Sequence, residues 1–120
     1  MSIVFKNQII TSKEETEKIK YIQKRPSGRK HYHIGVWIEG TKGELDKIKK
    51  VEYLLHPTFK QPLRYSEKRE NGFGVNFWTY GWFLIHAKIY FKDGTILEQN
   101  YNLEYALPEF NDDNYIKVGD

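Results

Sequence analysis

Hydrophobic and polar residues alternate along much of the chain with the period of two that is typical of β-strands. The clearest run is Phe83–Phe91, in which every second residue is apolar. Ile96–Leu103 follows it after Lys92-Asp93-Gly94-Thr95, whose residues favour a tight turn. Together the two runs predict a β-hairpin, because a short turn brings the second run back beside the first.

Shorter alternating runs predict further strands, each ended by turn-forming residues. These runs cover residues 17–24, 32–39 and 51–55. Residues 3–10, apolar at both ends, could form an edge strand, and a turn is expected at 13–15. Leu45 and Ile48 are three residues apart, which predicts one helical turn over residues 44–49. No segment predicts a long helix of the kind that joins parallel strands. The expected fold class is therefore all-β, an antiparallel β-sandwich with at most short helical turns.

The length of 120 residues predicts a single domain over 1–120. Its core is expected at about 17–105, and a polar, partly loose tail at 109–120. Cysteine is absent, which excludes disulfides, iron–sulfur clusters and thiol catalysis. The sequence has neither a leader-like N-terminus nor an 18-residue apolar run, so a cytoplasmic location without membrane insertion is expected.

Motifs that would indicate catalysis or a metal site are weak. His31 and His33 would share one face of a strand and could bind a metal with His86 or Glu39, but two half-exposed histidines are the simpler interpretation. Thr58 lies two residues from His56 and could be imagined as a nucleophile, although no orienting carboxylate lies near them in sequence. The sequence therefore predicts a protein that is not an enzyme and that has no metal or cofactor.

Aromatic residues crowd together between positions 73 and 83, with glycines among them. The cluster contains Phe73, Phe77, Trp78, Tyr80, Trp82 and Phe83. Too many of them are adjacent for all to face one core. Two interpretations remain open: a bulky sandwich end covered by its own loops, or an aromatic-walled slot for a flat or apolar ligand.

Basic residues form three short groups, around positions 24–30, 47–50 and 64–69. With aromatic neighbours they could form a nucleic-acid surface. However, acidic residues interleave with most of these groups, and 19 basic side chains against 16 acidic ones give a net charge of only +3. A solvated surface is the better interpretation, so nucleic acid is not an expected partner.

Two motifs in order resemble the YEATS-domain family. The strand and loop Val51–Phe59, with Gln61-Pro62-Leu63-Arg64 after it, resembles the first motif of the family, which has Leu-His, any residue, Ser or Thr, and Phe. Thr79-Tyr80-Gly81-Trp82-Phe83 resembles the second, and Ile89-Tyr90-Phe91 ends the next strand as in the family. The likeness covers roughly 17–105 and is closest to the prokaryotic branch, which occurs in bacterial proteins.

The resemblance implies an immunoglobulin-like sandwich whose loops at one end read acylated lysine. By position, the two rings that hold the acyl chain would be Phe59 and Tyr80. The hydroxyl of Thr58 and the backbone amide of Tyr80 would hold the acyl-amide oxygen, and His56 would support the hydroxyl. A further aromatic wall would come from His31 or Tyr32.

The second motif departs from the family at two positions. Thr79 stands where the family usually has glycine, and therefore adds a Cβ beside the ring of Tyr80. Trp82 occupies a variable position, one residue after the small Gly81. All four residues of 79–82 are included in the expected ligand site.

Two functions follow from these observations. The first is a non-enzymatic recognition module that binds an acylated lysine (acetyl- or crotonyl-like) on a protein or peptide, or a similar small acyl ligand. Such a slot needs π faces and amide-directed hydrogen bonds but no countercharge, because acyl-lysine is neutral. The alternative is a protein-interaction domain with a closed, vestigial slot, which docks a partner through an edge strand or the Trp-rich loop.

Overall fold

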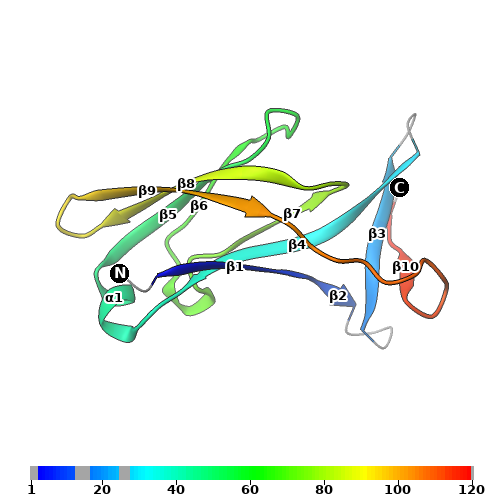
Figure 1. Ribbon diagram of the computed structural model, residues 1–120, viewed down its shortest axis with the longest axis horizontal. Coiled ribbons are helices and arrows are strands. Elements are labelled where there is room, and N and C mark those ends of the chain that lie inside the picture. The colour runs from blue at the N-terminus through cyan, green and yellow to red at the C-terminus, as the bar shows by residue number, and fades with distance from the viewer. Residues whose placement is uncertain (1–2, 13–16, 25–27, 120) are drawn as a thin grey trace. The chain divides into compact units, whose positions relative to one another are not determined.

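The computed structural model describes residues 3–12, 17–24 and 28–119 (Figure 1). The turn expected at 13–15 lies outside the described residues. The elements, in chain order, are β1 (Val4–Ile9), β2 (Thr11–Ser12), β3 (Lys18–Lys24), β4 (Arg29–Glu39), α1 (Lys42–Asp46), β5 (Ile48–Leu54), β6 (Leu63–Ser66), the 3₁₀ turn η1 (Arg69–Asn71), β7 (Val75–Thr79), β8 (Phe83–Phe91), β9 (Ile96–Leu103) and β10 (Tyr115–Lys117).

The strands form two sheets, and the fold is the expected all-β sandwich. One sheet has the order β6-β5-β8-β9, and all its pairings are antiparallel. The other contains β1-β4-β3-β10, with β2 on β3 and β7 on β4. The hairpin predicted from residues 83–103 is confirmed, with Phe83 opposite Leu103 and Tyr90 opposite Ile96.

By contacts, the chain divides into two compact units. Unit 1 comprises the described residues within Met1–Lys6, Val36–Val75 and Phe83–Leu103, and unit 2 those within Asn7–Gly35, Asn76–Trp82 and Glu104–Asp120. The single domain expected over 1–120 stays a prediction.

The core of unit 1 is built around Tyr53 of β5, whose side chain is fully buried. Its phenol donates a hydrogen bond of 2.6 Å to the carbonyl oxygen of Phe73, and the ring of Phe5 meets its face edge-on at 6.1 Å between centroids. Burial raises the pKa of the Tyr53 phenol far above its usual value. Alternate residues of β8 (Ile85, Ala87 and Ile89) complete this core, as the period of two predicts.

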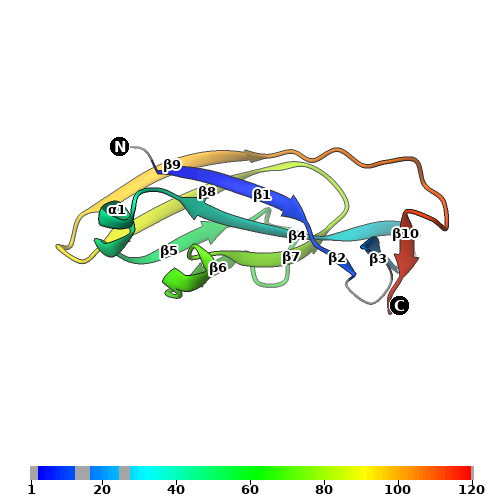
Figure 2. The same ribbon diagram turned by 90° about the horizontal axis from the view of Figure 1, so that it is seen from below.

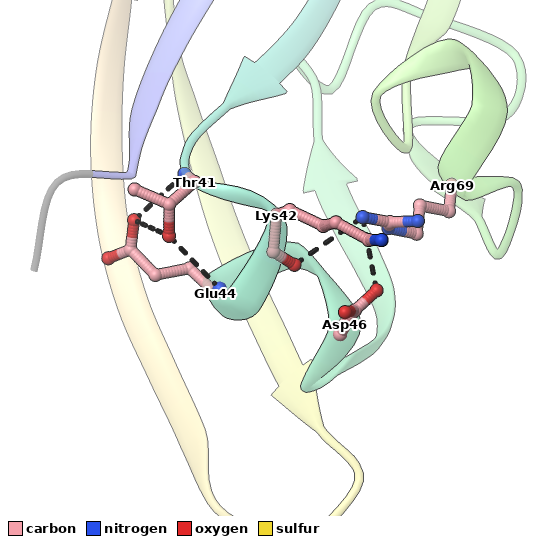
Figure 3. A network of polar contacts seen from close by, with 5 residues as sticks. All are labelled: Thr41, Lys42, Glu44, Asp46 and Arg69. Carbon is pink, nitrogen blue, oxygen red and sulfur yellow. Dashed lines mark hydrogen bonds and ion pairs between the residues drawn. The ribbon is translucent and has the colours of Figure 1, made fainter.

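The short helix α1 begins at Lys42, two residues earlier than the sequence suggested, because Thr41 caps it. The Thr41 hydroxyl accepts from the backbone N–H of Glu44, and the Glu44 carboxylate accepts from the backbone N–H of Thr41 (Figure 3). Arg69 ties η1 to the helix, donating to the Lys42 carbonyl and pairing with Asp46 at 3.0 Å. The helix ends at Asp46, and Ile48, which the sequence placed in the helical turn, starts β5 instead.

Unit 2 contains a strand that sequence analysis did not predict. The tail 109–120 was expected to be polar and partly loose, and within it β10 runs parallel to β3, with Tyr115 opposite Ile19. The two strands lie side by side in Figure 2. Tyr115 is only 5% exposed and its phenol donates to the carbonyl of Pro108 at 2.7 Å. A three-residue strand with one buried aromatic leaves no alternating pattern to detect, which explains why sequence analysis did not predict β10.

Candidate functional site

The loop after β5, residues 56–59, lies in unit 1 and contains the first group of expected site residues. Nδ1 of His56 lies 2.9 Å from the Thr58 hydroxyl oxygen and 3.3 Å from the Thr58 backbone nitrogen. Because a backbone N–H can only donate, Nδ1 is the acceptor in this pair. The Thr58 hydroxyl then also donates to Nδ1, so its oxygen keeps lone pairs for a further donor.

Phe59 is held by the same loop. Its backbone N–H donates to the carbonyl of His56 at 3.1 Å, which closes a tight turn. Its ring lies 5.5 Å from the ring of Phe83, with the planes tilted by 52°. The base of the loop is closed by a bond of 2.7 Å from the Leu55 N–H to the carbonyl of Pro62. The loop therefore fixes an imidazole, a hydroxyl and a phenyl ring within four residues.

The turn at the end of β7, residues 79–82, lies in unit 2 and contains the second group. The hydroxyl of Thr79 donates to the carbonyl of Gly81 at 3.2 Å and accepts from the Gly81 N–H at 3.4 Å. Thr79 is 5% exposed, whereas Tyr80 is 49% exposed. Thr79 therefore points inward and closes the turn, and Tyr80 is left outside.

The ring of Tyr80 contacts two residues of β4. The imidazole of His31 meets it edge-on at 5.1 Å, and the guanidinium carbon of Arg29 lies 4.6 Å from its centroid. Burial lowers the pKa of His31; the Arg29 carbonyl opposes this, and the charges of Lys24 and Arg29 lower it further. Sequence analysis counted Arg29 only among the basic residues around positions 24–30 and did not assign it to the site.

Tyr32 lies on the opposite face of β4 from His31. Neighbouring residues of a strand point to opposite faces, so Tyr32 lies on the face of β4 that carries the buried Ile34. There its ring lies 6.0 Å from that of Tyr115, and burial raises the pKa of its phenol. Of the two candidates for a further wall beside Tyr80, His31 is the one in contact with the Tyr80 ring, and the role of Tyr32 in ligand binding stays a prediction.

Trp82 is anchored at its edge while its indole stays 60% exposed. Its Nε1–H donates to the Tyr105 carbonyl at 3.0 Å, and the two rings meet edge-on at 6.5 Å. The Tyr105 phenol donates to the carbonyl of Gly81 at 3.3 Å. Burial raises its pKa to about 12, and the nearby Tyr32 contributes to this shift. Tyr105, which sequence analysis missed, thus holds the turn 79–82 through its contacts with Gly81 and Trp82.

The expected site residues therefore fall into two groups. His56, Thr58 and Phe59 are brought together in unit 1, and residues 79–82 are brought together in unit 2. Among residues 3–12, 17–24 and 28–119, no three His, Asp or Glu side chains are grouped as metal ligands would be. In the same part of the chain, no helix has the length and apolar character needed to cross a bilayer.

Comparison with known families identifies the fold. The model for the prokaryotic YEATS domain matches residues 32–104, which is more than half of the chain. The chain belongs to the prokaryotic YEATS domain family. Both loops described above fall inside the matched range of this YEATS domain. A search of curated proteins gives no match.

Solved YEATS domains share the architecture. The yeast AF-9 homolog Yaf9 matches with a TM-score of 0.62 and 22% identity, over 88% of this chain and 67% of the other. The Yaf9 YEATS domain recognizing an H3K122suc peptide gives 0.57 and 22%, over 83% and 67%. The Yaf9 YEATS domain bound to H3K27ac gives 0.57 and 20%, over 88% and 76%. At this level of identity the likeness establishes the fold of this YEATS domain.

Proposed function

We propose that this YEATS domain is a non-enzymatic reader that binds an acylated lysine, acetyl- or crotonyl-like, on a protein or peptide. The observation that carries the proposal is the convergence of both Thr58 donors on Nδ1 of His56, next to Phe59, at the positions of the first family motif. The Yaf9 structures with acylated histone peptides support the same class of ligand.

In this proposal Thr58 acts as an acceptor. Its hydroxyl proton is directed to His56, so we assign the hydroxyl oxygen to the N–H of the acyl amide, in place of the acyl-amide oxygen that the family resemblance assigned to it. The carbonyl is then assigned to the backbone N–H of Tyr80, the role that the family resemblance gives it. An acyl amide has one donor and one acceptor, and this assignment matches each of them.

The rings of Phe59 and Tyr80 are assigned to the acyl chain. Apolar stacking favours a flat chain on a π face, whereas an unmodified lysine would lose hydration without gaining a countercharge in the slot. Tyr80 is exposed and held by Arg29 and His31 on β4, so its ring is available in a fixed orientation. A rigid ring loses little conformational entropy on binding.

The alternative is a protein-interaction domain whose slot is filled by its own side chains. The exposed indole of Trp82, at 60% exposure, is the observation that favours it, because a rigidly anchored, exposed Trp is typical of interface centres. In that case the partner would bind Trp82 whether or not its lysine is acylated.

Titration with three peptides of one sequence tests the proposal. Their central lysine is unmodified, acetylated or crotonylated, and binding is followed by calorimetry and by NMR chemical shifts. We expect both acylated peptides to bind, the unmodified one not to bind, and Tyr80→Ala to abolish binding. Tyr65→Ala, which removes another exposed tyrosine (60%), is the matched control.

Absence of binding by both acylated peptides at millimolar concentration would refute the reader function for lysine marks. Shift changes around Trp82 with all three peptides, and none near His56, would favour the interaction domain instead.

A further inference from the structure

Cationic side chains gather on one face of β3 and β4 in unit 2, the face opposite to the buried Ile34. Antiparallel pairing places Lys24 opposite Arg29 and Ile22 opposite His31. Residues that are directly opposite share a face, and alternate residues of a strand return to it. The members of this basic face are Lys18, Lys20, Lys24, Arg29, His31 and His33, with Trp78 and Tyr80 of the neighbouring segment against the two histidines.

No acidic residue belongs to β3, to residues 29–33 of β4 or to residues 76–82. The nearest in sequence is Glu17, just before β3. The net charge of the whole chain, +3, does not show this asymmetry, because it also counts the acidic residues outside these three segments. The sequence groups basic residues by position along the chain, whereas the strand register groups them by face.

The electrostatics of the two histidines agree with this placement. The charges of Lys24 and Arg29 contribute to the lowered pKa of His31, and that of Lys20 contributes at His33. Burial is the larger cause in both cases. The lysines and the arginine are the four cations of this face. Three of them, Lys20, Lys24 and Arg29, are therefore close enough for their charge to act on the imidazoles that contact Tyr80 and Trp78.

We propose that the acylated lysine read by this domain is flanked by acidic residues, which bind the basic face around Tyr80. The inference rests on the proposed function, because Tyr80 is both a ring of the proposed acyl site and a neighbour of Arg29 on this face. Because Arg29 contacts the ring of Tyr80, residues next to an acyl-lysine that reaches Tyr80 come close to at least this cation of the basic face. A tail rich in lysine and arginine would be repelled there.

The spacing of the cations suits an extended peptide. Alternate positions of a strand are about 6.6 Å apart, from a rise of about 3.3 Å per residue, and an extended peptide places alternate side chains at the same interval. Lys20 and Lys24 are two such steps apart, with Ile22 between them. Each exposed ion pair is expected to change the affinity about twofold to fivefold at low salt, and less as the salt concentration rises.

Three crotonyl-lysine peptides test the inference, with flanks of aspartate and glutamate, of glycine and serine, or of lysine and arginine. At about 50 mM salt, where exposed charges are weakly screened, we expect the acidic peptide to bind about tenfold more tightly than the neutral one. The basic peptide is expected to bind most weakly. The double variant Lys20→Glu/Lys24→Glu should reverse this order. Lys68→Glu/Lys92→Glu, with the same change in net charge at two exposed lysines of unit 1, should not.

Each outcome decides between the two proposals. Equal binding of the three peptides, or an order that Lys20→Glu/Lys24→Glu leaves unchanged, overturns the acidic flank while the reader function stands. Failure of all three to bind removes the reader function and this inference with it. Tighter binding of a single-stranded oligonucleotide than of the acidic peptide, lost in the same variant, would assign the face to nucleic acid and overturn the inference.

Discussion

The imidazole of His33 lies flat against the indole of Trp78, with the ring centroids 4.6 Å apart and the planes only 7° from parallel. Nδ1 of His33 is buried and has no hydrogen-bond partner among the described residues. Burial lowers the pKa of His33; a hydrogen bond with Asn76 opposes this, and the charge of Lys20 adds to the lowering. Burial therefore favours the neutral form of the stacked ring.

The first prediction concerns the titration of His33. Its imidazole is expected to titrate below 6.5, the ordinary value, in an NMR pH series. Because the unfolded chain takes up the proton first as the pH falls, the free energy of unfolding should decrease from about pH 7 downwards. Lys20→Gln should move the midpoint of His33 upwards, and Lys92→Gln should not. A midpoint of 6.5 or above would contradict the burial of this ring.

The second prediction separates the effect of the Thr58 hydroxyl on binding from the effect of the size of its side chain. Thr58→Val keeps the volume and the backbone N–H bond to His56 but removes the acceptor proposed for the acyl amide. Affinity for a crotonyl-lysine peptide should fall by up to about tenfold, as for the loss of one hydrogen bond. Thr58→Ser should bind within about twofold of the wild type. Since Thr58 is exposed, the melting temperature of neither variant should change much.

If Thr58→Val and the wild type bound equally, the acceptor role would be wrong, even if the peptide still bound elsewhere in the domain. If Thr58→Ser also lost binding, the threonine methyl group would be the important feature instead.

The third prediction concerns Gly74, in the loop that supports Tyr53. A Cβ at Gly74 would lie 2.9 Å from the Val36 carbonyl oxygen and 3.0 Å from that of Asn71. Both are backbone atoms and cannot turn away, so Gly74→Ala should lower the free energy of unfolding by about 1–3 kcal/mol. Gly43→Ala is the control, because a Cβ there meets nothing within 4 Å and alanine favours the helix. Urea unfolding measures the free energy of unfolding of both variants. If Gly74→Ala were as stable as the wild type, the loop would have relaxed to accommodate the added Cβ.

The fourth prediction concerns the alkaline limit of stability. Burial raises the pKa of Tyr105 to about 12, while an exposed tyrosine titrates near 10. Between these values the unfolded chain has lost a proton that the folded chain keeps, so stability should decline as the pH rises. Tyr105→Phe should make this decline shallower between pH 10 and 12. It should also reduce stability slightly at pH 7, because the bond to Gly81 is lost.

Urea titrations of both proteins at several pH values check this prediction. The buried Tyr53, whose pKa is also raised, contributes equally to both and so cancels in the comparison. Parallel curves for the two proteins would contradict the burial of the Tyr105 phenol.

Strands with a strict alternation were predictable, because a face that must be buried imposes a period of two on the residues that form it. Residues 83–91 and 96–103 were identified with the bounds that the structure has. The helix start at Lys42 was missed by two residues, although the capping pair Thr41 and Glu44 was present in the sequence. The strand β10 had no signal, because its pairing with β3 depends on residues about a hundred positions away.

Local contacts within the site followed from short spacing. His56 and Thr58 are two residues apart, so a loop can bring them together without help from the rest of the chain. The contacts of Tyr80 are different, because Arg29 and His31 lie about fifty residues before it. Sequence could place His31 and Tyr32 near this region but could not choose between them, since the choice depends on which face of β4 is buried.

By itself, the sequence determined the all-β class, the strands of strong alternation and the motif residues of the YEATS family, because these depend on patterns within a few residues. Only the tertiary structure decided which faces those strands expose. It turned Thr79 inward, placed Trp82 on Tyr105, and gathered four cations on one face of β3 and β4, where Arg29 contacts Tyr80. The physical reason is strand pairing: register joins residues that are distant in the chain, and a shift by one residue would move each of them to the opposite face.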